Sequence, residues 1–141
     1  MRFMVLVKAT EDSEAGKLPD EKLLVTMGKF NEELIKAGVM LAGDGLHASS
    51  KGARIKLSAT GPAIVTDVPF TETKELISGF WMIQVKSKAE AIEWFKRCPA
   101  FVGEIEVRQV LDAADFEPVI RTDDGRATLK AEEEFRRQSN N

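Results

Sequence analysis

Residues 19 to 38 read PDEKLLVTMGKFNEELIKAG and carry the clearest helical pattern in the chain. Apolar side chains recur there at intervals of three and four residues, which places them on one face of a helix. Pro19 suits the first turn of a helix, and Gly38 suits the position just after a helix ends, because it tolerates a positive φ. The pattern therefore predicts an amphipathic helix over residues 20–37, with one buried face formed by Leu23, Met27, Phe30 and Leu34.

Short apolar runs that are typical of strands lie on both sides of this helix. Residues 3–7 precede it, and residues 39–42 follow it. The second run ends at Gly-Asp-Gly, residues 43–45, which indicates a tight turn or a bulge where the backbone approaches another group closely. Residues 10–17 are polar and contain a glycine, so we expect a loop between the first strand and the helix.

After a predicted hairpin, the second half of the chain has the same order of elements as the first half: a strand, a helix and a strand. Residues 54–58 and 63–66 flank a Gly-Pro turn and predict the two strands of the β-hairpin. Residues 80–85 form a nearly continuous apolar run, and residues 104–108 alternate between apolar and polar side chains, so both runs predict strands. A second helix is expected between them, beginning after Ser87 as its capping residue.

Without the hairpin, the order of elements is βαββαβ, the ferredoxin-like unit with two helices on one face of an antiparallel sheet. The strands at residues 3–7 and 80–85 are apolar on both sides, so the second face of the sheet also needs cover. A second copy of the chain is the simplest cover, in a twofold face-to-face pairing. We therefore expect an α+β, ferredoxin-like fold with an inserted hairpin, assembled as a homodimer.

The composition is that of a single folded domain. The chain has 141 residues, of which 43% are hydrophobic and 30% are charged, and a chain of this length can bury one core. We expect the domain to span residues 1–118. Residues 119–141 are poor in apolar side chains and form a polar C-terminal tail that is compatible with a charged helix.

Several classes of partner are disfavoured. The net charge is −3 with no basic block, which argues against direct nucleic-acid binding. No apolar run approaches the ~18 residues of a membrane span, so we expect no membrane partner. A single cysteine and the absence of an export signal at the N-terminus predict a cytoplasmic location.

Few side chains can carry chemistry. His47 is the single histidine, and histidine is the residue type that most readily exchanges protons near neutral pH. Cys98 precedes a proline at a helix end and is expected to be a buried apolar residue instead of a nucleophile. Asp44, His47 and Asp67 could meet around a divalent cation, but their spacing matches no metal motif, so we expect no metal and no cofactor.

Two stretches, GDGLH at residues 43–47 and VTDVPFTETKE at residues 65–75, together with Gly79-Phe80, resemble the DGPF branch of the YCII-related (YciI-like) family. That branch is named for an Asp-Gly-Pro-Phe sequence followed by Ala-Glu-Thr-Lys-Glu. This chain departs from the pattern at Val68, where the family has glycine, and at Thr71, where alanine is usual. The resemblance extends over residues 1–112 in order and spacing.

The resemblance implies a dimeric α+β barrel with a cleft near the sheet interface. In some relatives it implies a catalytic His-Asp pair, and one relative removes chloride from a chlorinated hydroxyquinol. The shorter YciI-type relatives have that histidine on the first helix. Here the corresponding position is Thr26, so only His47 could replace it, from a different element.

These observations predict a small-molecule enzyme of the YCII-related type, similar to a lyase or dehydrochlorinase, that uses acid/base chemistry on a polar or phenolic substrate. His47 would be the general acid or base, Asp67 would orient it, and Lys74 would stabilise an anion. The other residues expected to bind substrate are Asp44, Phe70, Glu72 and Trp81. The alternative is a non-catalytic small-molecule-binding or regulatory module, associated with a sigma factor as many DGPF members are.

Each of these residues also has a plainer structural interpretation. Asp67 stands before a turn and could accept backbone N–H groups there. Residues 72–75 could form a solvated charged loop with a weak ion pair. Trp81 is compatible with a place in the core, as aromatic residues on strands usually are, and His47 with a place in a surface loop.

Overall fold

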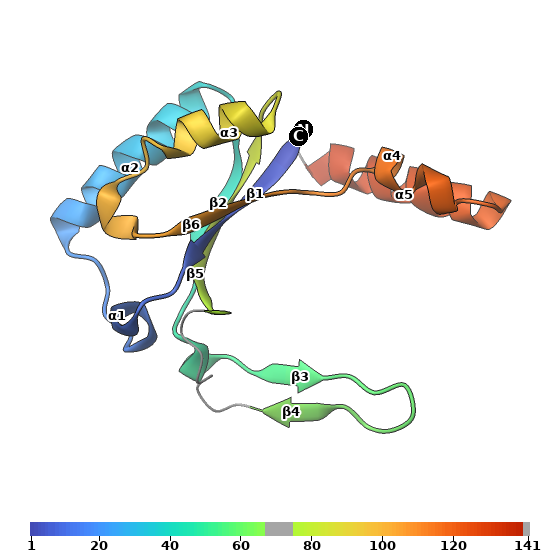
Figure 1. The fold of residues 1–141 in the computed structure, drawn as a ribbon, viewed down its shortest axis with the longest axis horizontal. Helices are drawn as coiled ribbons and strands as arrows, with labels where there is room; N and C mark the ends of the chain where they lie inside the picture. Colours follow the sequence, from blue (N-terminus) through green and yellow to red (C-terminus); the bar gives the residue numbers. More distant parts are fainter. Residues whose placement is uncertain (67–74, 140–141) are drawn as a thin grey trace.

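The structure is built on a four-stranded antiparallel sheet with two helices on one face (Figure 1). The computed structural model describes residues 1–66 and 75–139 of the chain. The strand order is β2-β5-β1-β6, and the strands are β1 (Arg2–Lys8), β2 (Met40–Gly45), β5 (Ile77–Gln84) and β6 (Ile105–Gln109). The covering helices are α2 (Glu21–Lys36) and α3 (Lys88–Phe95). This is the ferredoxin-like βαββαβ arrangement, so the predicted fold class is confirmed.

The core lies between the sheet and the two helices. Alternate side chains of β1 and β5 point toward the helices and are buried, because successive residues of a strand face opposite sides of the sheet; they are Phe3, Val5, Trp81 and Ile83. Phe30 of α2 and Phe95 of α3 meet them. The ring centroid of Trp81 lies 6.2 Å from that of Phe30 and 5.1 Å from that of Phe95, in edge-on contacts. Each such pair contributes about 0.5–1.5 kcal/mol beyond its buried area.

The other face of the sheet carries no helix (Figure 1). Met4 pairs with Met82 and Leu6 pairs with Phe80 across β1 and β5, so these four side chains share that face. All four are only half-buried. The prediction that both sides of these strands are apolar is therefore confirmed, and a single chain leaves one side accessible.

The expectation of a plain loop over residues 10–17 is wrong. This segment contains a one-turn helix, α1 (Glu11–Glu14). Thr10 caps it, since the amide of Ser13 donates a hydrogen bond to Thr10 Oγ1 at 3.1 Å. The Ser13 hydroxyl accepts in turn from the amide of Thr10 at 2.8 Å, and the two bonds satisfy N–H groups at the helix start that otherwise lack partners.

The prediction of a turn or bulge at residues 43–45 is also wrong in position. The Gly-Asp-Gly sequence continues β2 to Gly45, which pairs with Gly79 of β5. The irregularity in this strand lies earlier, between Met40 and Ala42. The expected close approach of the backbone is present, because a Cβ atom on Gly79 would lie 3.0 Å from the carbonyl oxygen of Asp44.

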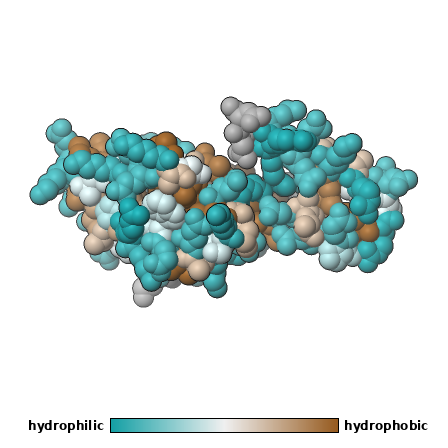
Figure 2. Space-filling view, turned by 90° about the horizontal axis from the view of Figure 1, so that it is seen from above, coloured by the Kyte–Doolittle hydropathy of each residue, from teal (hydrophilic) through white to brown (hydrophobic). Residues whose placement is uncertain are grey.

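Two segments project away from the helix layer, on the side of the open sheet face (Figure 1). One is the predicted hairpin, formed by β3 (Arg54–Lys56) and β4 (Ile64–Thr66), which follow the short 3-10 helix η1 (Ser49–Lys51). The other, residues 111–139, is termed the C-terminal arm; it contains α4 (Ala113–Phe116), η4 (Glu117–Val119) and α5 (Asp123–Ser139). Apolar surface is visible both on the sheet with its helices and on the part of the molecule that projects from them (Figure 2). In the part of the chain that the structure describes, no helix is long and apolar enough to cross a membrane.

Cys98 packs against the core at the end of α3. Burial raises the pKa of its thiol from 9.0 to about 11. Because the thiolate is the reactive form, a rise of two pKa units leaves about 100-fold less thiolate at pH 8 than in an exposed cysteine. We expect iodoacetamide to modify the folded protein about 100-fold more slowly than the urea-unfolded chain, with the difference shrinking as the pH rises toward 11. Equal rates at pH 8 would contradict this burial.

Candidate functional site

A cleft of about 830 Å³ opens at the end of the sheet where β2 stops and β5 begins. Its walls come from segments far apart in the sequence: the end of β1, the α1–α2 connection, the first turns of α2, the end of β2, the start of β5, and the 3-10 helix η3 (Ala100–Val102). Asp44, His47, Phe80 and Trp81 all border it. The structure therefore brings together three of the residues that the sequence indicated for the site, Asp44, His47 and Trp81.

Glycines keep the cleft open on the helix side of the sheet. Gly43 pairs with Trp81 and Gly45 pairs with Gly79, so these positions face the same side as the buried Trp81 ring. A Cβ atom on Gly43 would come within 2.9 Å of Trp81 Cδ1, whereas a Cβ atom on Gly45 would meet nothing within 4 Å. A larger residue at position 43 would therefore clash with the Trp81 ring, whereas the space beside Gly45 is empty and belongs to the cleft.

Trp81 connects the cleft to the core. Only 6% of the residue is exposed, and its indole Nε1 donates a hydrogen bond of 2.8 Å to Asn31 Oδ1 on α2. The buried indole N–H therefore has a partner, which fixes the plane of the ring. Asn31 also borders the cleft. Trp81 thus combines the two interpretations that its sequence position allowed, a core residue with one edge at the site.

His47 stands at the rim, between two anchored residues. On one side, the amide of Leu46 donates to the carbonyl oxygen of Ser78 at 2.8 Å, which extends the β2–β5 contact. On the other side, the amide of Ser49 donates to Glu14 Oε1 of α1 at 3.1 Å, and the Ser49 hydroxyl bonds the second carboxylate oxygen of Glu14. This clamp between α1 and η1 holds the segment that carries His47 against the cleft.

The charged groups around the cleft are of both signs. Asp20 serves mainly as the cap of α2, since Leu23 N donates to its Oδ1 at 2.9 Å, and Lys17 lies 3.8 Å from Asp12. Among the ionisable residues that line the cleft, that leaves Lys8, Asp44 and His47, whose side chains make no hydrogen bond or ion pair with any residue in the ranges 1–66 and 75–139. The cleft is therefore bordered by a lysine, an aspartate and a histidine whose side chains have no such partner.

The candidate residues divide between the two sides of the sheet. Asp44 pairs with Phe80, and Gly43 pairs with Trp81, so the Asp44 and Trp81 side chains point to opposite faces although both residues border the cleft. His47 lies beyond the end of β2 and is exposed. Four further candidates, Asp67, Phe70, Glu72 and Lys74, fall outside the described residues.

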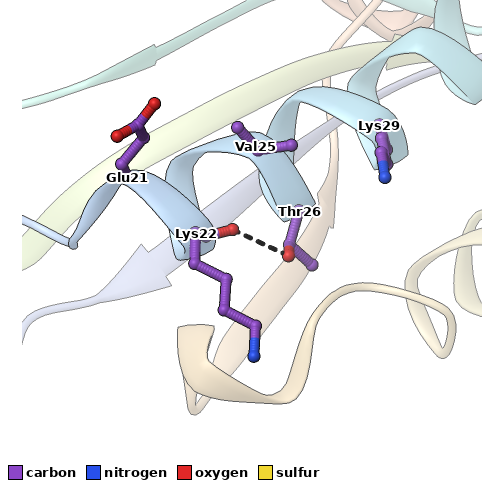
Figure 3. A pocket seen from close by; sticks show the side chains of 5 residues that line it. All are labelled: Glu21, Lys22, Val25, Thr26 and Lys29. Carbon is purple, nitrogen blue, oxygen red and sulfur yellow. Dashed lines mark hydrogen bonds between the residues drawn. The ribbon is translucent and has the colours of Figure 1, made fainter.

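Thr26, which the sequence resemblance matches to the helix histidine of the shorter relatives, does not line this cleft. It belongs to a shallow surface hollow on α2 with Glu21, Lys22, Val25 and Lys29 (Figure 3). Its hydroxyl donates to the carbonyl oxygen of Lys22 at 2.9 Å, within its own helix. All five side chains come from one helix and are exposed, so the hollow encloses nothing.

Some residues of the cleft were not predicted from the sequence. Lys8 and Asn31 border the cleft from a strand and a helix, and Glu14, in the supposed loop, bonds Ser49 beside it; none of the three belongs to a local motif. Their role follows only from the way the chain folds. The structure also offers no cluster of three His, Cys, Asp or Glu side chains that could hold a metal ion, within the ranges it describes.

Comparisons with known proteins place the chain in a family. Uncharacterized protein R00369 of Rhizobium meliloti (strain 1021) is 32% identical over 79 residues, which are 56% of this chain and 63% of that protein, less than two thirds of its length. Among solved structures, 5-chloro-2-hydroxyhydroquinone dehydrochlorinase (TftG) from Burkholderia phenoliruptrix AC1100, in complex with 2,5-dihydroxybenzoquinone, gives a TM-score of 0.45 at 16% identity, covering 79% of this chain and 95% of that chain. A similarity of that size assigns neither fold nor function. The family model of the YCII-related domain matches residues 1–114, so the chain belongs to the YCII-related family.

Proposed function

We propose that this protein binds a small polar or phenolic molecule in the cleft and transfers protons to or from it. The observation that carries the proposal is the glycine-lined space beside Trp81, with His47 and Asp44 at its edge. An apolar aromatic wall with a few polar groups is the usual composition of a small-molecule site. His47 would be the general acid or base, because imidazole can both accept and give a proton near neutral pH.

The same proposal assigns roles to the other candidate residues. Asp67 would orient the imidazole and Lys74 would stabilise an anion, with Phe70 and Glu72 contacting the substrate, as the DGPF resemblance implies. Lys8 could hold an anionic oxygen from the opposite wall, since it borders the cleft at the end of β1. The reaction class we favour is an elimination of the lyase or dehydrochlorinase type, carried out in the cytoplasm.

A second function is supported by a specific observation. His47 is exposed, and its imidazole makes no hydrogen bond to any residue that the structure describes. A catalytic histidine usually has an orienting partner, so the lack of one among residues 1–66 and 75–139 favours a non-catalytic binding or regulatory module, for instance one that acts with a sigma factor. The two functions share the ligand site and differ in whether His47 is needed for chemistry or only for affinity.

Blocking the cleft is the first test of this proposal. We expect Gly45→Leu to abolish binding of small phenols such as catechol, hydroquinone and 4-hydroxybenzoate, because the new side chain would occupy space that is empty in the structure. Binding is measured by isothermal titration calorimetry on the folded variant. The matched control is Gly28→Leu, since Gly28 on α2 also has open space around it and does not line the cleft. Loss of binding in both variants, or in neither, would contradict the proposed site.

We further propose that the working form is a homodimer joined through the open face of the sheet. The half-buried pairs Met4–Met82 and Leu6–Phe80 form an apolar centre on that face, and exposed apolar patches of this kind mark interfaces. We expect light scattering to give about twice the chain mass of 15.6 kDa. A mass near 15.6 kDa at micromolar concentration would contradict the dimer.

A further inference from the structure

The hairpin (residues 54–66) and the C-terminal arm (residues 111–139) are both unusually exposed for folded segments. Every residue from 50 to 66 is exposed. Helix α5 contains no buried residue, and the side-chain hydrogen bonds and ion pairs of its described residues stay within residues 117–139. Both segments project from the same side of the sheet, one at each end of the open face (Figure 1).

The hairpin presents an apolar surface with positive charge around it. Ile55 and Val65 are directly paired and so share one face, where they are 58% and 64% exposed. Lys56 points to the other face, opposite Ile64. Residues 48–66 contain three basic side chains and no acidic one. A two-stranded hairpin is only marginally stable by itself in water, so this one requires a surface to pack on.

Helix α5 presents an apolar surface with negative charge around it. Ala127, Ala131 and Phe135 follow one another at intervals of four residues and form one stripe along the helix, with Phe135 70% exposed. Glu134 and Asp124 lie next to this stripe by helical spacing. The arm as a whole carries eight acidic and five basic residues. The helix side that packs within the arm is a different one, where Gly125 approaches the Ile120 side chain.

These two surfaces are complementary, because both are apolar and the charges around them are opposite in sign. Within one subunit, however, they lie at opposite ends of the open sheet face (Figure 1). A twofold axis perpendicular to the line between them, and parallel to the sheet, exchanges the two ends. It would place the hairpin of each subunit beside the arm of the other, and it would make the contact twice. The alternative axis, along that line, would place two positively charged hairpins together.

We propose that in the dimer each hairpin packs its Ile55 and Val65 face along the stripe formed by Ala127, Ala131 and Phe135 on helix α5 of the other subunit. The inference rests on the proposed dimer and adds its geometry: the two sheets face each other, and hairpin and arm close the assembly at both ends.

Cross-linking between differently tagged chains tests this arrangement. In a Cys98→Ala background, one chain carries Lys56→Cys on the hairpin and the other carries Ala131→Cys on α5; they are co-expressed and treated with a short bismaleimide. We expect a covalent dimer that contains both tags. The matched control pairs Lys56→Cys with Lys29→Cys, which lies on the outer side of α2 (Figure 3), and should give none.

The other outcomes separate this inference from the proposals it rests on. A dimer by light scattering without the hairpin–arm cross-link would overturn the inference alone, as would cross-linking of Lys56→Cys chains to each other. A monomer would overturn both the dimer and the inference. None of these results affects the ligand-binding test with Gly45→Leu.

Interface variants give a second measurement on the full-length chain. Ile55→Ser and Phe135→Ser each remove an exposed apolar side chain, so the fold of a single subunit should not change. We expect each variant to raise the dissociation constant of the dimer about tenfold, as loss of a central apolar contact does. Ile35→Ser, on the outer side of α2 and 61% exposed, is the control and should leave the constant unchanged. Equal constants for all three variants and the native chain would contradict the contact.

Discussion

Replacing His47 with glutamine is expected to lower the turnover of a substrate by about 10²–10⁴-fold, with the fold intact. The reason is that His47 is the single histidine of the chain and borders the cleft, so no second imidazole can replace it. Glutamine keeps a polar side chain of similar reach but cannot carry a proton between groups. Because His47 is exposed and lies outside the core, its loss should leave the melting temperature nearly unchanged.

The control for this variant is Lys29→Gln, which changes an exposed residue in the shallow hollow of α2 (Figure 3). It should leave turnover and binding unchanged. If His47→Gln retains full turnover, the acid/base role is wrong. If the protein shows no turnover but His47→Gln weakens the binding of a phenol, the protein is a binding module of the kind proposed as the alternative.

Leu34→Ala is expected to lower the free energy of unfolding by about 2–5 kcal/mol, because it removes buried methyl groups and leaves a cavity. Leu34 is completely buried, in the cluster that joins α2 to the sheet. The measurement is urea denaturation of both proteins, compared at equal protein concentration because dimer formation makes stability depend on concentration.

The neighbouring residue supplies the control. Ile35 is next in the same helix and is 61% exposed, so Ile35→Ala removes a similar side chain from water instead of from the core. We expect a change within about 0.5 kcal/mol. Similar losses at the two positions would show that α2 does not pack on the sheet through the face described.

The helix at residues 20–37 shows what the local spacing of apolar residues can and cannot predict. The spacing of Leu23, Met27, Phe30 and Leu34 correctly identified the inward face. Only Phe30 and Leu34 are fully buried, whereas Leu23 and Met27 are half-buried and border the cleft. Periodicity gives the side of a helix that points inward, but it does not reveal that the first two turns cover an open space instead of a packed core.

The error at residues 43–45 has a different cause. Gly-Asp-Gly favours a turn when only neighbouring residues are considered. Here Gly45 pairs with Gly79, which is far away in the sequence, and two facing glycines let the strands come close without side chains between them. Pairing partners of this kind depend on the whole sheet, so a local pattern does not contain them.

The sequence likewise indicated some of the residues around the cleft and not others. Asp44, His47 and Trp81, which border the cleft, were indicated by the sequence because each has an unusual residue type or belongs to a motif. Lys8 was missed because only the tertiary fold brings it to the cleft, and the Glu14–Ser49 clamp was missed because its two residues meet only in the folded chain. Membership in the DGPF branch, and the roles of Asp67 and Lys74, stay predictions from the sequence.

The most direct test of the proposed site is a crystal structure of the protein with a bound phenol such as catechol. The account predicts the ring in the cleft, against the edge of Trp81 and over Gly45, with a hydroxyl oxygen about 2.6–3.2 Å from a ring nitrogen of His47, directly or through one water. Density for the phenol at any other place, with the cleft empty and the imidazole turned to solvent, would contradict it.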